Sequence, residues 1–121
     1  MIEGIGIDIV NISRMDTLST VALHRLFHEM EVTYALTLQE KQRSEYLAGR
    51  FAAKEALGKA LGTGLSGIAP SDICIETGEK GNPIMKLYGK AKTLVGNREV
   101  LVSITHDSPV ASAIVLLQER R

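Results

Sequence analysis

Large apolar residues alternate with small or polar ones near the start of the chain. The large apolar side chains are Ile5, Ile7 and Ile9. Because successive side chains of a β-strand point to opposite faces, this alternation predicts a strand over 2–10. Its second face would carry Gly4, Gly6 and Asp8 in the middle of the strand. Glycine inside a strand indicates close approach of a ligand or of another backbone, and the pattern leaves both readings open.

Two further stretches show the apolar spacing of amphipathic helices. This spacing predicts a first helix over 14–30 and a second, longer helix over 38–61. Gly62 would end the second helix, since glycine readily adopts the left-handed conformation of a helix terminus. Gly49 and Gly58 lie inside this helix, where each costs about 1 kcal/mol relative to alanine. We therefore expect a packing or ligand reason for these two glycines.

The second half of the chain alternates short apolar runs with residues that favour turns. These runs predict a short helix over 90–95 and strands over 73–76, 84–87, 100–105 and 110–117. The connection 106–109 is tight, which favours antiparallel pairing of the last two strands. One long and one shorter main helix, together with a mostly antiparallel sheet, indicate an α+β fold.

Composition limits the functional classes. With 121 residues, the chain is expected to form a single domain, 1–121. The formal net charge is zero, so no overall field would attract nucleic acid or a membrane surface. The single cysteine, Cys74, lies in an apolar run, which favours a buried structural thiol in a reducing, cytoplasmic setting. No apolar run is long enough to span a bilayer, and no signal-peptide pattern opens the chain.

Several polar residues suggest chemistry on a phosphate. Glu55 and Lys59 lie about one helical turn apart and therefore face the same way. Such a pair is commonly a surface ion pair worth a few tenths of a kcal/mol, but a carboxylate can also hold a hard cation and an ammonium a phosphate. Asp8 could supply a second carboxylate, and His106 with Asp107 stands at a strand end. The sequence does not show whether these elements meet.

Three segments carry a resemblance to a known family. They read G-I-G-I-D-I-V near the start, L-A-G-R-F-A-A-K-E-A-L-G-K-A-L-G-T-G in the middle and V-S-I-T-H-D near the end. In this order and spacing, the segments resemble the holo-acyl-carrier-protein synthase family of 4′-phosphopantetheinyl transferases. The resemblance covers essentially the whole chain, and its central segment is long enough to be specific.

The resemblance implies a fold, an assembly and a reaction. The implied fold is that of 4′-phosphopantetheinyl transferases, in a homotrimer whose sites lie between subunits. Enzymes of this family move the 4′-phosphopantetheine arm of coenzyme A onto a serine of apo acyl carrier protein, for fatty acid biosynthesis. The reaction requires Mg²⁺ and releases adenosine 3′,5′-bisphosphate. Coenzyme A and an acyl carrier protein are thus the implied partners.

The resemblance also assigns roles to individual residues. Asp8 and Glu55 match the family's metal-binding carboxylates, and Lys59 matches the lysine that contacts the coenzyme A phosphates. The positions that match the nucleotide site and the turn beside it are Arg50, His106, Gly62, Thr63 and Gly64. Arg14 matches a basic residue that faces the acidic carrier protein.

The expected catalytic residues are Glu55, Lys59 and His106. The group that accepts the serine proton stays open among Glu55, a metal-bound water and the pair formed by His106 and Asp107. The segment after the first helix is shorter than its counterpart in the family. The sequence therefore does not assign which basic residues of 37–45 contact the nucleotide.

Two other functions remain open at this point. One is a transferase of the same family that serves peptide-synthetase or polyketide carrier domains, although those enzymes are typically much longer, as fused pseudo-dimers. The other is a catalytically silent nucleotide-binding or oligomerisation module. Loss of Asp8, Glu55 or Lys59 would favour such a module, but all three residues are present.

Overall fold

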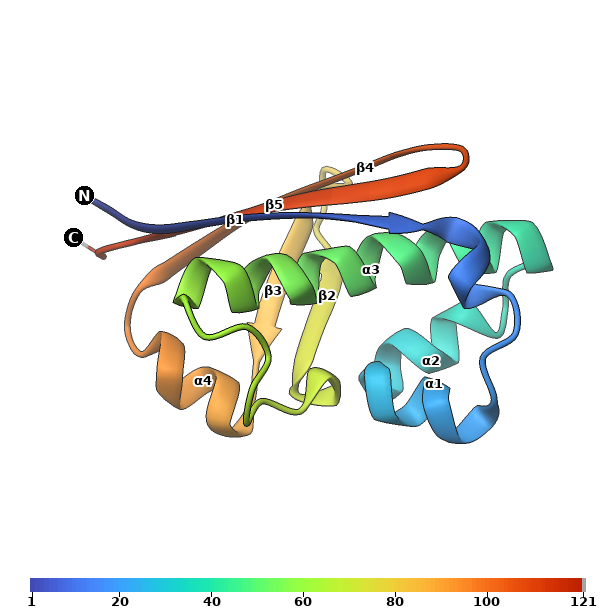
Figure 1. The fold of residues 1–121 in the computed structure, drawn as a ribbon, viewed down its shortest axis with the longest axis horizontal. Helices are drawn as coiled ribbons and strands as arrows, with labels where there is room; N and C mark the ends of the chain where they lie inside the picture. The colour runs from blue at the N-terminus through green and yellow to red at the C-terminus, as the bar shows by residue number, and fades with distance from the viewer. Residues whose placement is uncertain (121) are drawn as a thin grey trace.

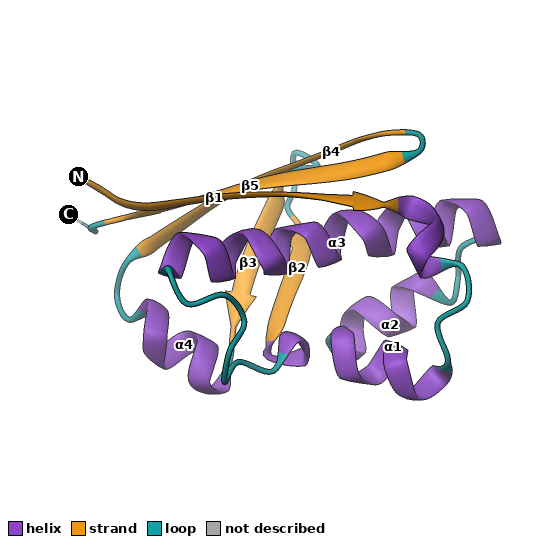
Figure 2. Cartoon of the chain, in the orientation of Figure 1, coloured by secondary structure: helices purple, strands orange, loops and turns teal. Residues whose placement is uncertain are grey.

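The structure, a computed structural model, describes residues 1–120 and is organised around one long helix. This helix, α3 (Glu40–Leu61), runs between a three-stranded sheet and a layer of shorter elements (Figures 1 and 2). The sheet has the strand order β1-β5-β4, and both of its pairings are antiparallel. Its strands are β1 (Ile2–Asn11), β4 (Glu99–Asp107) and β5 (Val110–Gln118).

The shorter elements lie on the other side of α3 (Figure 1). They include an antiparallel hairpin of β2 (Ile73–Thr77) and β3 (Pro83–Leu87). The short helices are α1 (Thr20–Leu26), α2 (Glu29–Ala35) and α4 (Gly89–Val95). The predicted α+β class is confirmed, and apart from the first helix every predicted bound lies within two residues of the observed one. No helix within residues 1–120 combines the length and the apolar character needed to cross a bilayer.

The expected helix over 14–30 is wrong. The chain forms instead a 3₁₀ turn (Ile12–Met15), then α1, then α2. Ser19 caps the start of α1 through its side chain, and His28 caps the start of α2. Between them Phe27 is extended, with φ −129° and ψ 148°, and is only 1% exposed. Capping side chains and the burial of one aromatic ring therefore interrupt a segment that apolar spacing alone would continue.

The glycine face of β1 packs directly on α3. A Cβ atom at Gly6 would lie 1.9 Å from the carbonyl oxygen of Ala56, and one at Gly4 would lie 2.2 Å from that of Ala60. Both distances are far below van der Waals contact with backbone that cannot rotate away. Of the two readings that the sequence left open, close approach of another backbone is the one confirmed for these glycines.

The glycines inside α3 also have a packing reason. A Cβ atom at Gly58 would lie 2.6 Å from the backbone carbonyl carbon of Gly64, which belongs to the segment that follows the helix. At Gly49 it would lie 2.8 Å from a side-chain methyl group of Ile104 on β4. The helix thus gives up propensity at two positions so that neighbouring segments can lie against it.

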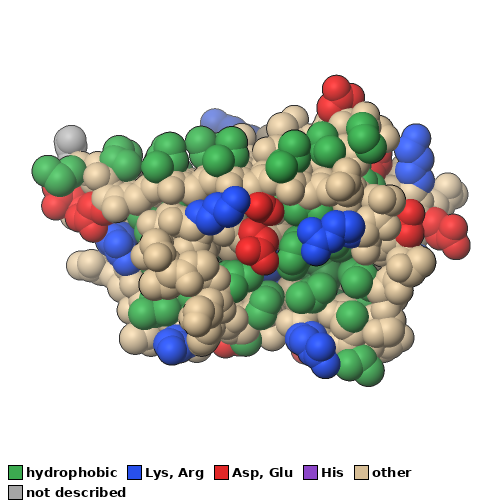
Figure 3. All heavy atoms as spheres, in the orientation of Figure 1, with side chains coloured by type: hydrophobic (Ala, Val, Ile, Leu, Met, Phe, Trp, Pro, Cys, Tyr) green, Lys and Arg blue, Asp and Glu red, His purple; other side chains and the backbone are tan. Residues whose placement is uncertain are grey.

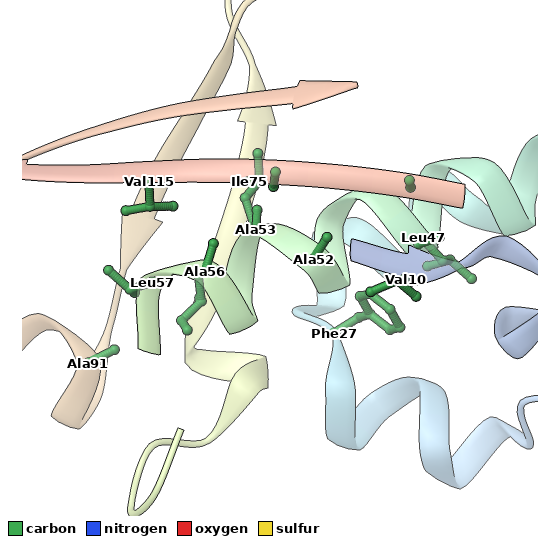
Figure 4. Close-up of a cluster of buried hydrophobic side chains, with 14 of the residues drawn as sticks. Val10, Phe27, Leu47, Ala52, Ala53, Ala56, Leu57, Ile75, Ala91 and Val115 are labelled. Carbon is green, nitrogen blue, oxygen red and sulfur yellow. The ribbon is translucent and has the colours of Figure 1, made fainter. Parts of the chain in front are cut away.

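The hydrophobic core lies on both sides of α3 (Figure 4). The helix contributes mainly small residues, and those with no exposed surface include Ala52, Ala53 and Ala56. Larger side chains from the surrounding elements fill the remaining space, among them Phe27, Ile75 and Val115. Small residues on the central helix allow the sheet and the hairpin to approach it closely, so the core needs few aromatic rings.

A buried ion pair joins the short elements to α3. Lys54 Nζ lies 2.6 Å from Glu31 Oε1, and the two side chains are 0% and 1% exposed. The ammonium also donates to the carbonyls of Leu26 and Pro70, both at 3.0 Å. Glu31 Oε2 accepts from the backbone N–H of Ile75 at 2.9 Å. Each charge is thus compensated by a partner and by further hydrogen bonds, as burial requires.

The opposite face of β1 is exposed. Ile5, Ile7 and Ile9, which we call the isoleucine face, are 61%, 61% and 64% exposed. Ile5 pairs with Leu116 of β5, which pairs in turn with Leu101 of β4, so the apolar surface continues across the sheet. Figure 3 shows a row of hydrophobic side chains along the edge of the molecule where β1 runs.

Candidate functional site

The structure brings Asp8 of β1 and Lys59 of α3 together. Lys59 Nζ donates to Asp8 Oδ1 at 3.1 Å and to the carbonyl of Ile7 at 2.9 Å. The Asp8 side chain is 17% exposed and the Lys59 side chain 54% exposed. The close packing of the β1 glycines on α3 sets the distance between these two elements. This first pairing of predicted site residues is therefore a direct consequence of the fold.

Glu55 lies one helical turn before Lys59 and feels the charge of Asp8. Burial raises the pKa of the Glu55 carboxyl above its usual value, and the negative charge of Asp8 raises it further. The positive charges of Lys59 and Arg14 lower it, but they do not cancel the rise. Asp8 and Glu55 are thus two carboxylates whose charges repel each other at the surface of the fold.

The carboxylates of Asp8 and Glu55 suit a hard divalent cation. Mg²⁺ is commonly held by one or two protein carboxylates, with water and substrate phosphate oxygens completing its coordination. Within residues 1–120, no group of three or more His, Cys, Asp and Glu side chains is arranged to hold a metal ion by itself. The donor set therefore fits a cation that is shared with a substrate better than one held by the protein alone.

Arg14 borders this group from the 3₁₀ turn that follows β1. Its guanidinium lies 5.5 Å from the centre of the Phe51 ring, and its charge reaches Glu55. The expectation that Arg14 opens the first helix is wrong, because α1 begins only at Thr20. In Figure 3, acidic side chains lie between two basic groups below the hydrophobic row, so this face carries both signs of charge side by side.

The turn after Lys59 exposes backbone near the same group. α3 ends at Gly62 with φ 80°, and Gly64 follows with φ 64°. The N–H groups of Thr63 and Gly64 both donate to the carbonyl of Gly58, at 3.3 and 2.9 Å. A Cβ atom at either positive-φ glycine would meet nothing within 4 Å. The predicted termination of α3 at Gly62 is confirmed, and the turn is open to solvent.

Arg50 belongs to a different part of the surface. Its guanidinium stacks on the ring of Tyr46 at 4.3 Å, and its Nη2 donates to Thr77 Oγ1 at 3.1 Å. Its Nε is buried and has no acceptor among the described residues. Arg50 is half a helical circumference away from Lys59 on α3, since nine residues correspond to about 2.5 turns. The hairpin side of α3 therefore carries Arg50, and the β1 side carries Lys59.

His106 also lies away from Asp8. It is the next-to-last residue of β4, and its Nδ1 is 3.9 Å from Glu45 Oε2. The strand β5 separates β4 from β1, and strand spacing puts the two outer strands about 10 Å apart. One chain therefore brings together Asp8, Glu55 and Lys59, with Arg14 beside them, and it holds Arg50 and His106 elsewhere.

Three residues that the sequence did not single out contact Arg50 or His106. They are Glu45, Tyr46 and Thr77. Tyr46 stands four residues before Arg50 on a predicted helix, so the helical spacing of aromatic and guanidinium could have revealed it. Glu45 and Thr77 depend on contacts between separate elements, and no local pattern indicates them.

Comparison with known proteins agrees with the fold and with the motifs. The chain is 40% identical over 123 residues to a holo-[acyl-carrier-protein] synthase of Treponema denticola, with 98% of this chain and 99% of that protein covered. The crystal structure of the synthase from Bacillus anthracis, in complex with CoA (3′,5′-ADP), matches with a TM-score of 0.87 and 35% identity over 99% of each chain. The acyl carrier protein synthase of Plasmodium yoelii with ADP bound matches with a TM-score of 0.88 and 29% identity, over 100% of this chain and 98% of that one.

A family match covers the same motifs. The family described as the 4′-phosphopantetheinyl transferase superfamily matches residues 4–113. This range includes the three segments that carry the resemblance, together with Asp8, Glu55, Lys59 and His106. The chain therefore belongs to the 4′-phosphopantetheinyl transferase superfamily.

Proposed function

We propose that this protein transfers 4′-phosphopantetheine from coenzyme A to a serine of an apo acyl carrier protein. The observation that carries the proposal is the meeting of Asp8, Glu55 and Lys59 on one face. A pair of carboxylates beside an ammonium suits a diphosphate and the cation that accompanies it. Relatives named holo-[acyl-carrier-protein] synthase, and a relative's structure in complex with CoA (3′,5′-ADP), support the same substrates.

Asp8 and Glu55 would together hold Mg²⁺. A bound Mg²⁺ would neutralise charge on the diphosphate of coenzyme A and orient its oxygens. Without the cation the two carboxylates repel each other, and this repulsion adds to the effect of burial in raising the pKa of Glu55. In the structure Lys59 compensates Asp8, and its half-exposed side chain has room to turn toward a phosphate oxygen instead.

In the transfer, the chain's own residues would stabilise charge, accept a proton and border the phosphates. The serine oxygen forms a bond to the β-phosphorus, the bond to the bridging oxygen breaks, and adenosine 3′,5′-bisphosphate leaves with the electron pair. Lys59 supplies positive charge where the leaving phosphate becomes more negative. The proton of the serine passes to a base, for which Glu55 and the pair of His106 and Asp107 are the candidates within the chain. The exposed turn Gly62–Gly64 lies at the same end of α3 as Lys59 and would border the phosphates.

We also propose that the site is completed by a second copy of the chain in a homotrimer. Arg50 and His106 would line the nucleotide site, yet one chain holds them away from Asp8. The isoleucine face offers an exposed apolar surface along the strand that carries Asp8. Apolar side chains at this exposure favour burial against another protein surface. An assembly through this face would bring Arg50 and His106 of a neighbouring chain next to Asp8, Glu55 and Lys59.

The carrier protein would approach from the side of Arg14. Carrier proteins are acidic and this chain has no net charge, so attraction must come from local basic residues. Arg14 is exposed and borders the proposed metal carboxylates, where it would attract an acidic partner that brings its serine to the site. The buried free thiol of Cys74 agrees with a reducing, cytoplasmic setting for the reaction.

Mass spectrometry of an apo acyl carrier protein tests the proposal directly. The carrier is incubated with the chain, coenzyme A and Mg²⁺, and a gain of one phosphopantetheine mass on its serine is expected. A parallel reaction with a peptide-synthetase carrier domain distinguishes the two kinds of transferase. If only that domain is modified efficiently, the proposed acyl carrier protein is not the substrate. If coenzyme A binds but neither carrier gains mass, the chain is a silent binding module and the proposed activity is wrong.

A further inference from the structure

Arg50 has an unusual set of contacts for an arginine on a helix. Its guanidinium lies over the ring of Tyr46 at 4.3 Å, which is close for a cation over an aromatic face. Thr77 accepts one hydrogen bond from its Nη2 at 3.1 Å. Its Nε is buried without an acceptor in the described chain. The side chain is therefore held from two sides while part of its hydrogen-bonding capacity is unused.

We propose that Tyr46 is a positioning residue that holds Arg50 ready for a phosphate group of coenzyme A. This inference rests on the proposed function, in which Arg50 lines the nucleotide site. Tyr46 itself need not touch the substrate, because it acts through the guanidinium that lies on its ring. The role differs from general packing, since it depends on an aromatic face at this position.

The buried Nε shows why the ring is needed. A buried donor without an acceptor costs on the order of 1–3 kcal/mol, and an arginine side chain has many solvent-exposed rotamers that would hydrate it. Stacking on Tyr46 and the hydrogen bond to Thr77 offset that cost and keep the guanidinium in place. Without the ring, the exposed rotamers become more favourable and the guanidinium leaves its position.

The Tyr46 ring lies against a second tyrosine ring and stays neutral. Tyr34 packs on the same ring, with centroids 4.9 Å apart and planes tilted by 57°. Burial raises the pKa of the Tyr46 phenol to about 12, so the hydroxyl keeps its proton at any physiological pH. Tyr34 does not carry the guanidinium, which makes it the matched control for loss of an aromatic ring in this cluster.

Calorimetric titration of the assembled protein with coenzyme A in Mg²⁺ tests the role of Tyr46. Tyr46→Leu should weaken coenzyme A binding by about 5- to 30-fold, the range of a partly buried cation–π contact. Tyr46→Phe keeps the aromatic face and should stay within about twofold of the wild type. Tyr34→Leu should also stay within about twofold, since exposed substitutions away from Arg50 have small effects. KM for the carrier protein should not change in any of the three variants.

A double-mutant cycle with Arg50→Gln decides whether Tyr46 acts through Arg50. In the Arg50→Gln background, Tyr46→Leu should cause no further loss of coenzyme A affinity. Undiminished affinity of Tyr46→Leu, an equal loss in Tyr34→Leu, or an additive loss in the Arg50→Gln background would each overturn the proposal. If thermal denaturation shows that Tyr46→Leu is unfolded, Tyr46→Met is measured instead, because it also removes the ring but its longer, flexible side chain adapts better to the space left. Carrier modification by the wild type is scored separately, so failure of the transferase activity is distinguishable from failure of this inference.

Discussion

Lys59 and Asp8, separated by 51 positions in the chain, form a direct hydrogen-bonded ion pair between α3 and β1. The pair joins two elements, and it also engages one oxygen of the Asp8 carboxylate, the group that would bind a metal ion. Lys59 is the more exposed partner and can move, whereas Asp8 is held on the strand. Within the chain, Lys59 thus compensates the charge of Asp8, a role that a cation would take over in the proposed mechanism.

The two carboxylates of the proposed metal site should be essential for turnover. Asp8→Asn and Glu55→Gln each keep size and remove charge, and each is expected to lower kcat by at least about 10²-fold, which is roughly 3 kcal/mol of barrier. Steady-state transfer to a carrier protein measures this. Excess chelator should abolish wild-type transfer, and Mg²⁺ or Mn²⁺ should restore it. Undiminished wild-type turnover in chelator would remove Asp8 and Glu55 as metal ligands.

Glu55 should make the stability of the metal-free protein depend on pH. Its folded-state pKa is raised, so the folded protein binds a proton at Glu55 more tightly than the unfolded chain does. Ionised Glu55 therefore opposes folding at neutral pH, and this cost is lost as pH falls through the folded-state pKa. Glu55→Gln should accordingly have a higher Tm than the wild type at about pH 7, and the difference should shrink toward about pH 4.

Thermal denaturation in chelator across this pH range provides the measurement for Glu55. Glu79→Gln, on the exposed turn between β2 and β3, serves as the surface control for loss of one carboxylate. The raised pKa of Glu55 is contradicted if the Tm difference between Glu55→Gln and the wild type stays constant with pH. It is also contradicted if that difference grows toward acid pH.

The glycine face of β1 should be intolerant of side chains. Gly6→Ala puts a methyl group 1.9 Å from the carbonyl oxygen of Ala56, so strand and helix must separate. We expect a loss of about 3 kcal/mol in stability, at the upper end of overpacking effects. Gly49→Ala is the comparison variant, because its methyl group meets a side-chain methyl group of Ile104 rather than backbone and alanine adds helix propensity, so a smaller loss is expected. Urea denaturation of both variants makes the comparison, and similar stabilities would show that α3 does not constrain β1.

The isoleucine face should control assembly. Ile7→Glu places a charge in the middle of this exposed apolar strand face and is expected to give monomers without transferase activity. Ile84→Glu, on the hairpin strand β3 at 39% exposure, is the control and should keep the wild-type mass. Light scattering at assay concentration measures both variants. A wild-type chain that is monomeric and active at that concentration would remove the proposed trimer.

Complementation offers a second measurement of the shared site. Asp8→Asn and His106→Ala are each expected to be nearly inactive as pure proteins. Mixed assemblies of the two would contain sites with an intact Asp8 from one chain and an intact His106 from another. Recovery of activity after subunit exchange is the expected outcome, and its absence in confirmed mixed assemblies argues for sites within one chain.

Arg14 should determine the affinity for the carrier protein. Arg14→Glu reverses one exposed charge beside the proposed metal site and is expected to raise KM for the carrier far more than KM for coenzyme A. The effect should shrink at high salt, because exposed charges are screened within about 10 Å at 0.1 M salt. Lys92→Glu on α4 gives the control charge reversal at another exposed basic residue. Equal changes in both KM values for Arg14→Glu would argue against docking beside Arg14.

Local chemistry determined much of this protein from its sequence alone. The alternation over β1, the spacing along α3 and the glycine at its end are properties of neighbouring residues, and the structure confirms each of them. The first helix was predicted wrongly for a physical reason. Its apolar spacing continued across Phe27, but the backbone at Phe27 is extended where its ring is buried in the core. Ser19 and His28 cap two separate helices on either side.

The meeting of the site residues was decided only in the tertiary structure. Asp8 reaches Lys59 because two glycines let β1 approach the backbone of α3, and no pattern near Asp8 reveals that distance. Arg50 and His106 matched the same site by resemblance, yet both lie away from Asp8 within one chain. Arg50 is on the opposite side of α3, and β5 separates the strand of His106 from that of Asp8. The sequence thus identifies the candidate site residues, whereas their grouping depends on packing between elements that are far apart along the chain.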